Sequence, residues 1–314
     1  MNALVLLEAH LQIGRQAFLL NPQLTRTLRQ EIAAWSHPPL PETAWKRIGF
    51  YVLQAQITGL WVTTLRGSGF SQREKNGLAR LGALTPLVDD WTDEQHLSAT
   101  DILERLHRGA GVVSQLYRQL FEGATDAFKF SFERALHAQE ESLAQFNHAP
   151  LSADRLREIS FRKGATAMVW YRHYFDNPLL AGEQEVFEWL GYALQLTNDL
   201  FDLYKDREAG QQTLVTNTRD MASVAGLFAE AVQQVRSKLF DLPYEVARLR
   251  KTWALIGTVL SRGGVCLDQL QRLQQHTGHF DPAVFTRAQL ICDMEKTRNV
   301  LAAWQHARRW MKAA

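Results

Sequence analysis

Apolar residues recur at spacings of three and four along most of this chain, which is the period of one face of an α-helix. One such run passes through Ile102, Leu106 and Val113, and another passes through Val186 and Leu190. The alternation of apolar and polar residues that is typical of strands is nearly absent. The pattern therefore predicts an all-α protein with roughly ten or more helices and little or no sheet.

Capping residues indicate where several of these helices begin. Ser98 precedes one periodic run, Ser152 precedes another, and the pair Asp281-Pro282 is typical of a helix start. Proline is absent from residues 87–149 and from residues 179–242, so uninterrupted helices can occupy both stretches. Linkers are short throughout, which favours a single all-helical domain over residues 1–314.

Composition and charge narrow the class of protein. The 314 residues are 46% apolar and 22% charged, which is typical of a folded globular protein. A net charge of +2 is nearly neutral for a chain of this length, so the overall charge does not indicate that the protein binds nucleic acid. No apolar run approaches the roughly 18 to 20 residues that span a bilayer, and the amino terminus does not resemble a secretion signal.

Cys266 and Cys292 are too few for a disulfide framework, and they fit a reducing compartment. We therefore expect a soluble, cytoplasmic protein whose contacts with membranes, if any, are peripheral. A homodimer is compatible with the sequence.

The first cluster of acidic residues ends an apolar helical segment. It places four carboxylates within six residues, namely Asp89, Asp90, Asp93 and Glu94. Asp89 and Asp93 are one helical turn apart, so they project from one face and repel each other. A divalent cation would reverse that repulsion, because Mg²⁺ prefers oxygen ligands from one or two carboxylates together with substrate phosphates. A solvated helix end is the alternative interpretation.

The second acidic cluster lies in residues 191–210. Asn198, Asp202 and Asp206 have the spacing i, i+4 and i+8, which predicts a polar stripe two helical turns long, with Asp199 beside it. Large apolar residues surround this stripe, namely Leu194, Leu196, Leu200, Phe201 and Leu203. A solvated amphipathic helix would not usually place carboxylates among so many apolar neighbours. An exposed acidic helix with incidental spacing is the alternative.

Two carboxylate-rich helices that face each other across a helical bundle can hold metal ions between them. Neither cluster contains histidine, so a di-iron carboxylate site is disfavoured. Ligation by oxygen alone points to Mg²⁺ and a phosphate-bearing substrate.

The two clusters together resemble the metal motifs of class I isoprenoid synthases, the superfamily that includes terpene cyclases, trans-prenyltransferases and squalene/phytoene synthases. Asp89-Asp90-x-x-Asp93-Glu94 resembles the first aspartate-rich motif of this superfamily. Residues 198–206 resemble the second motif, in a form between that of terpene cyclases and the Gln-Leu-x-Asp-Asp-x-x-Asp of prenyltransferases. The order, separation and helical setting of the motifs agree across nearly the whole chain.

The resemblance implies a helical bundle around a deep apolar pocket, with three Mg²⁺ ions at its mouth. The implied metal ligands are Asp89, Asp90, Asp93, Asn198, Asp202 and Asp206. Among them Asp89, Asp93, Asn198 and Asp202 are expected to be essential for catalysis. The ions would bind the diphosphate of a prenyl diphosphate substrate and act as Lewis acids on the leaving group.

Basic residues should complete a diphosphate site. The candidates are Arg157, Arg162, Lys163 and Lys205. The first three lie on a helix between the motifs, where the superfamily commonly places a diphosphate-sensing Arg or Lys, and we expect this helix to break or bend at Gly164. Ordinary surface charge is the alternative interpretation. The carboxy-terminal Arg-Tyr pair of bacterial terpene cyclases is absent, and Arg298, Arg308 and Arg309 are candidate substitutes.

The sequence favours a Mg²⁺-dependent class I terpene synthase, a carbon–oxygen lyase acting on phosphates. It would ionise an acyclic prenyl diphosphate, farnesyl or geranylgeranyl diphosphate, to a carbocation and release diphosphate and a terpene. A prenyltransferase is one alternative, although Trp45-Lys46-Arg47 lacks the glycine of the usual Gly-Lys-Arg sequence. A squalene/phytoene synthase-like condensing enzyme is another, because Asp89 and Asp93 satisfy its Asp-x-x-x-Asp spacing. An acidic helical scaffold is the non-enzyme alternative.

Overall fold

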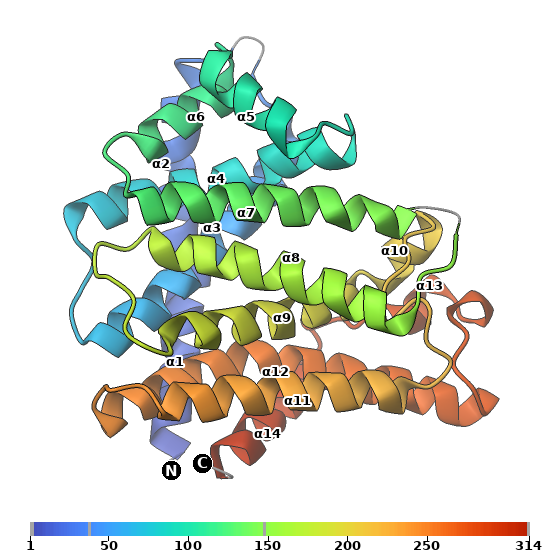
Figure 1. The fold of residues 1–314 in the computed structure, drawn as a ribbon. Coiled ribbons are helices and arrows are strands. Elements are labelled where there is room, and N and C mark those ends of the chain that lie inside the picture. The colour runs from blue at the N-terminus through green and yellow to red at the C-terminus, as the bar shows by residue number, and fades with distance from the viewer. Residues whose placement is uncertain (1–2, 37–38, 147–148, 313–314) are drawn as a thin grey trace. The chain divides into compact units, whose positions relative to one another are not determined.

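The all-helical fold predicted from the sequence is confirmed. The computed structural model describes residues 3–36, 39–146 and 149–312, and none of these residues lies in a strand (Figure 1). The chain divides into two compact units. Unit 1 comprises residues 1–9, 141–168 and 180–314, and unit 2 comprises residues 10–140 and 169–179. The single domain over residues 1–314 stays a prediction.

Unit 2 contains most of the first half of the chain. Its helices are the end of α1 (Ala3–Arg15), the π-helix η1 (Gln16–Leu20), α2 (Asn21–Ala33), α3 (Glu42–Arg66), α4 (Gln72–Asp93), α5 (Ala99–Arg108), α6 (Val112–Phe121), most of α7 (Asp126–Ser142) and the last turn of α8 (Ala153–His173). Aromatic rings of α6, α7 and the end of α8 form part of its core, with Phe132 lying 5.0 Å from Phe121 and 4.9 Å from Trp170 between ring centroids.

Helix α4, which carries the first acidic cluster, is fixed at its beginning by a capping box. The Ser71 hydroxyl accepts from the backbone N–H of Glu74, and the Glu74 carboxylate accepts from the backbone N–H of Ser71. Glu74 is fully buried and forms two 2.6 Å hydrogen bonds with Arg66 at the end of α3. Further along, α4 passes so close to α3 that a side chain on Gly82 would lie 2.7 Å from the carbonyl oxygen of Tyr51.

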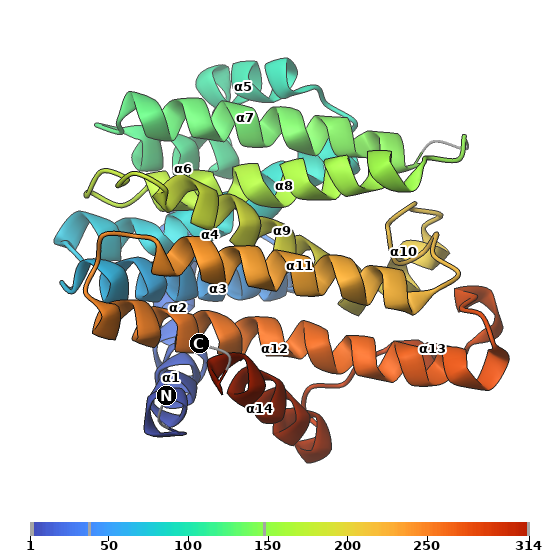
Figure 2. The same ribbon diagram turned by 60° about the horizontal axis from the view of Figure 1, so that its bottom comes forward.

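Unit 1 contains most of the second half of the chain. Its elements are the start of α1, the end of α7, the 3-10 turn η2 (Leu143–Phe146), most of α8, α9 (Glu183–Phe201), α10 (Leu203–Glu208), α11 (Met221–Phe240), α12 (Val246–Thr277), η3 (Pro282–Val284), α13 (Arg287–Leu290) and α14 (Thr297–Lys312). The long helices α11 and α12 lie side by side in both views, and α14 packs against α12 (Figures 1 and 2).

The predicted helix starts can be compared with these bounds. Ser98 caps α5, and α8 begins directly after Ser152, as predicted. Asp281 also acts as a cap, since its carboxylate accepts from the backbone N–H of Ala283 at 2.9 Å. It opens one 3-10 turn, however, which is shorter than the predicted helix.

Of the predicted break or bend at Gly164, the break is wrong, because α8 continues without interruption from Ala153 to His173, and the bend stays a prediction. Gly164 instead lets α8 approach α9: a side chain there would lie 2.6 Å from the carbonyl carbon of Gly191. A glycine inside a helix thus marks close packing here. Among the described residues, no helix combines the length and the apolar character that crossing a bilayer requires.

Candidate functional site

The first acidic cluster occupies the last turn of α4, within unit 2. Asp89 is half-buried, and its carboxylate accepts a 3.4 Å hydrogen bond from the hydroxyl of Tyr51 on α3. Asp90 forms an ion pair with Arg47. Asp93 is exposed and accepts a 2.9 Å hydrogen bond from the side-chain amide of Gln139 on α7. The three predicted aspartates therefore lie one after another along the end of the helix, each with a polar neighbour from another helix.

Two tyrosines lie close to Asp89 and remain neutral. The negative charge of Asp89, together with burial, raises the pKa of Tyr51 well above its ordinary value. Burial raises the pKa of Tyr171, whose hydroxyl is 2.8 Å from that of Thr85. Both phenols can therefore act as hydrogen-bond donors at neutral pH.

Sequence reasoning did not connect Arg47, Tyr51 and Gln139 with the first cluster. Arg47 and Tyr51 lie on α3 and Gln139 lies on α7, so each meets α4 only through helix packing. The spacing of residues along one helix carries no information about such neighbours.

The second acidic cluster lies where α9 gives way to α10, within unit 1. Helix α9 ends at Phe201, and the backbone of Asp202 turns aside, with φ of −88° and ψ of 1°, before α10 begins at Leu203. The backbone N–H groups of Asp202 and Asp206 still donate to the carbonyls of Asn198 and Asp202, both at 2.8 Å. The predicted straight stripe is therefore bent at Asp202. Asn198 is exposed, Asp202 is half-buried and Asp206 is buried.

Asp199 is the most deeply buried carboxylate of this cluster. Its side chain is 3% exposed and accepts hydrogen bonds from the Gln195 amide at 2.7 Å and from the Ser160 hydroxyl at 3.4 Å. Burial raises its pKa to about 6, although these hydrogen bonds and the charge of Lys163 oppose the rise. At pH 7, then, Asp199 brings a negative charge into a desolvated position.

Asp206 is 6% exposed and shares this environment. Burial first, and then repulsion from Asp199 and Asp202, raise its pKa to about 7, while Lys205 and Lys163 oppose the rise. The two buried carboxylates, Asp199 and Asp206, therefore disfavour their own ionised forms, and a bound cation would relieve this cost.

The donor set of both clusters fits the chemistry of Mg²⁺, since it consists only of carboxylate and amide oxygens. Among the described residues, no group of three or more His, Cys, Asp or Glu side chains is already arranged around one point as a metal site. The structure thus supplies suitable ligands without an assembled coordination shell, and the assignment of individual ligands stays a prediction.

The four predicted diphosphate-binding residues have different surroundings. Lys163 is half-buried, and its charge acts on both Asp199 and Asp206. Lys205 is exposed, 4.0 Å from Asp202. Arg157 donates to both carboxylate oxygens of Glu230 at 2.9 Å, and Arg162 lies 2.8 Å from Glu141. The structure therefore brings the two lysines to the second cluster and pairs the two arginines with other carboxylates.

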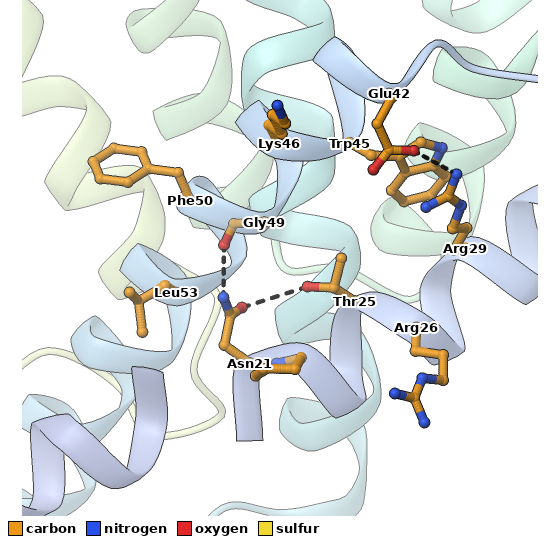
Figure 3. Close-up of a pocket in the computed structure, with 11 residues that line it drawn as sticks. Asn21, Thr25, Arg26, Arg29, Glu42, Trp45, Lys46, Gly49, Phe50 and Leu53 are labelled. Carbon is orange, nitrogen blue, oxygen red and sulfur yellow. Dashed lines mark hydrogen bonds and ion pairs between the residues drawn. The ribbon is translucent and has the colours of Figure 1, made fainter. Parts of the chain in front are cut away.

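The carboxy-terminal arginines Arg298, Arg308 and Arg309 are exposed on α14. Their predicted role as substitutes for an Arg-Tyr pair stays a prediction, as does the deep apolar pocket. A hollow of about 520 Å³ lies elsewhere, between α2 and α3, and no residue of either acidic cluster lines it (Figure 3).

No protein-family model matches this chain, and neither does any curated protein. A crystal structure of a dehydrosqualene synthase in complex with a ligand is similar to it in fold. The two chains are 13% identical, the similarity covers 87% of this chain and 99% of that chain, and the TM-score is 0.47. The similarity is a likeness of fold alone.

Proposed function

We propose that this protein is a Mg²⁺-dependent class I terpene synthase that ionises an acyclic prenyl diphosphate, farnesyl or geranylgeranyl diphosphate. The observation that carries this proposal is the burial of Asp206, a predicted metal ligand that is 6% exposed and lies near the buried Asp199; this burial raises the pKa of Asp206 to about 7. A solvated acidic helix would not bury two carboxylates at this cost. A site that binds a divalent cation recovers the cost on binding, which favours an enzyme over an acidic scaffold.

In this proposal Asp202, Asp206 and Asn198 hold metal on unit 1, and Asp89, Asp90 and Asp93 hold metal on unit 2. Bound Mg²⁺ would supply Lewis-acid stabilisation of the leaving diphosphate. Lys163 and Lys205 would bind diphosphate oxygens, because their ammonium groups already lie beside the second cluster. Tyr51 would hold the Asp89 carboxylate in place through its hydrogen bond.

The chemical step is heterolysis of the bond between C1 of the prenyl chain and the diphosphate oxygen. The electron pair leaves with the diphosphate. The allylic cation that remains either loses a proton to the released diphosphate or to water, which gives a hydrocarbon, or adds water and then loses a proton, which gives an alcohol. Leu200 and Leu203 are fully buried on either side of Asp202. They keep part of this neighbourhood apolar, which strengthens the attraction between the lysines and the leaving group.

Incubation of the protein with Mg²⁺ and geranyl, farnesyl or geranylgeranyl diphosphate tests the proposal. Diphosphate release would be measured, and the organic extract would be analysed by gas chromatography. We expect release from a single substrate together with a hydrocarbon or alcohol terpene. A product that requires two diphosphate substrates would establish the condensing alternative. If diphosphate were released from none of the three substrates, the acidic helical scaffold would be the interpretation that remains.

Single substitutions at the acidic clusters link any such activity to these residues. We expect Asp89→Ala, Asp93→Ala and Asp202→Ala each to lower turnover by about 10² or more, because each removes a ligand that stabilises charge in the transition state. Asp241→Asn is the matched control, since Asp241 is exposed at the end of α11, outside both clusters. If the three variants turned over like the control, the acidic clusters would not be the active site.

A further inference from the structure

Residues 10–30 form a stretch of the chain that is basic and free of acidic residues. It contains Arg15, Arg26 and Arg29 and not one Asp or Glu. In unit 2 it runs from the end of α1 through η1 into α2. Three large apolar side chains are exposed along it, namely Leu11 at 66%, Phe18 at 82% and Leu19 at 59%. Apolar side chains grouped in this way mark an interaction surface more often than scattered ones do.

The exposure of Phe18 and Leu19 follows from the local backbone. Gln16–Leu20 is a π-helix with no buried residue, and the backbone N–H of Asn21 donates to the carbonyl of Gln16. Pro22 lies in the first turn of α2 and has no N–H, so the carbonyl of Phe18 cannot receive the usual helical hydrogen bond from it. The wider π turn accommodates this loss.

The same segment is held firmly against α3. The Asn21 side-chain amide donates to the carbonyl of Gly49 at 3.0 Å (Figure 3). Its oxygen accepts from the Gln56 amide at 3.1 Å. The turn before Asn21 is therefore anchored at its end, and the backbone keeps Phe18 and Leu19 pointing outward.

A groove of about 520 Å³ between α2 and α3 is lined in part by the same stretch, through Pro22, Arg26 and Arg29. Figure 3 shows Phe50 and Leu53 together at one end of it, and Arg26 and Arg29 at the other. Lys46 and Phe50 are exposed on α3. The groove thus combines an apolar end with cations.

The acidic side chains of these helices cancel only part of that charge, because one of them pairs with Arg29 and the other with an arginine of another helix. Helix α2 contains one acidic residue, Glu31, which lies 2.7 Å from Arg80. Helix α3 also contains one, Glu42, which lies 2.7 Å from Arg29. Arg15, Arg26 and Lys46 are exposed and make no ion pair within the described part of the chain.

We propose that this surface, the amino-terminal face formed by Leu11, Arg15, Phe18, Leu19, Arg26 and Lys46, docks on an anionic lipid bilayer. Phe18 and Leu19 enter the boundary between headgroups and acyl chains, while the three cations contact lipid phosphates. A helix with exposed apolar and basic side chains lies in the plane of the interface. Charge complementarity selects an anionic surface, because the segment carries cations and no carboxylate.

Flotation of the full chain with lipid vesicles tests the proposal. We expect binding to vesicles of phosphatidylcholine mixed with phosphatidylglycerol, little binding to phosphatidylcholine alone, and release as salt screens the charges. Phe18→Ser combined with Leu19→Ser should lower binding by about tenfold or more. Phe130→Ser is the matched control, because Phe130 is also exposed, at 62%, but lies on α7.

Charge substitutions test the electrostatic part separately. Arg26→Gln combined with Lys46→Gln should weaken binding roughly 25-fold, since each cation near an anionic surface contributes about fivefold. Lys75→Gln, an exposed lysine on α4, should leave binding unchanged. If the Phe18/Leu19 variant lost its helical circular dichroism, the charge variants and the salt dependence would decide the proposal.

Three results would overturn it. The first is no binding to either type of vesicle, and the second is equal binding to both types by the parent and all variants. The third is a stable dimer of the parent in light scattering that the Phe18→Ser, Leu19→Ser variant converts to a monomer. In that case the amino-terminal face would be an interface between two copies of the protein.

Discussion

Gly164 on α8 and Gly191 on α9 face each other so closely that neither position has room for a side chain. A Cβ atom on Gly164 would lie 2.6 Å from the carbonyl carbon of Gly191, and one on Gly191 would lie 2.8 Å from the backbone nitrogen of Ala165. The obstructing atoms belong to the backbone, so no rotamer change can relieve the contact. The two helices carry Lys163 and Asp199, and this close approach helps to place the lysine charge beside the buried carboxylate.

Gly164→Ala should therefore destabilise the protein by about 2–3 kcal/mol, because the added methyl group forces α8 and α9 apart. The melting temperature should fall by roughly 5 °C for a chain of this size. Gly226→Ala is the control: Gly226 lies on α11, and a side chain there would meet no atom within 4 Å. Equal melting temperatures for the two variants would contradict the close packing of α8 on α9.

Asp206→Asn should stabilise the protein in the absence of metal at pH 8. The folded-state pKa of Asp206 is raised from 3.8 to about 7, so the folded state binds more protons than the unfolded state between these values. Its contribution to stability therefore falls as pH rises through this window. Relative to the parent, the free energy of unfolding of the variant should be higher by on the order of 2–4 kcal/mol at pH 8 and nearly unchanged at pH 4.

Thermal unfolding in the presence of a chelator at both pH values measures this difference. Added Mg²⁺ should reduce the advantage of the variant, because the cation stabilises the ionised carboxylate of the parent. A gain that is the same at pH 4 and pH 8 would show that Asp206 is not a desolvated carboxylate.

Mg²⁺ and diphosphate should raise the melting temperature together more than the sum of their separate effects, since each compensates the charge of the other. If Mg²⁺ and diphosphate bind together as one ligand, a roughly hundredfold excess over their Kd raises the free energy of unfolding by about 2.7 kcal/mol. Lys163→Ala should shrink this joint shift more than Arg162→Ala does, because Arg162 is already paired with Glu141. Differential scanning fluorimetry measures the shift in melting temperature that Mg²⁺ and diphosphate cause together in each variant. An equal shift in the two variants would contradict the assignment of diphosphate binding to Lys163.

Asp199→Asn should retain turnover within a few-fold of the parent, whereas Asp202→Asn should lose about 10² or more. The amide at position 199 keeps an oxygen that accepts from Gln195, and its NH2 group can donate to the Ser160 hydroxyl, which then accepts. Asp202 lies at the bend between α9 and α10, where an oxygen ligand of a metal is expected. Steady-state rates of diphosphate release compare the two, and the reverse order would refute the ligand assignment.

Glu74→Gln should destabilise the protein by about 3 kcal/mol at neutral pH, because it leaves the largely buried guanidinium of Arg66 without its carboxylate. The hydrogen bonds from Arg66, Ser71 and Asp176 hold the pKa of Glu74 below its usual 4.5 against the opposing effect of burial. Because its pKa is lowered on folding, the Glu74 carboxylate stabilises the fold above pH 4.5. This stabilisation is lost as the pH falls through the folded-state pKa.

The difference between parent and Glu74→Gln should accordingly shrink in acid. Glu104→Gln is the control, since its ion pair with Arg108 is exposed and should contribute less than about 1 kcal/mol. Urea unfolding at neutral and acidic pH measures both variants. A Glu74→Gln variant as stable as Glu104→Gln would contradict the buried ion pair at the start of α4.

The sequence by itself determined the all-helical fold, the caps at Ser98 and Ser152, and the end of the first acidic helix. It did not determine the bend at Asp202 that ends the second. The features that it determined depend on signals that act within a turn or two, such as the 3.6-residue period, capping side chains and missing prolines. They could be predicted because the residues that produce them are neighbours along the chain.

Only the tertiary structure decided which charged residues are buried and which residues they meet. Asp199 accepts from Ser160, 39 residues earlier, and Arg157 pairs with Glu230, 73 residues later. The same is true of Gly164, which looked like a helix breaker in the sequence and proved to be the point where α8 meets α9. Burial and ion pairing depend on which helices pack together, and no local pattern encodes that choice.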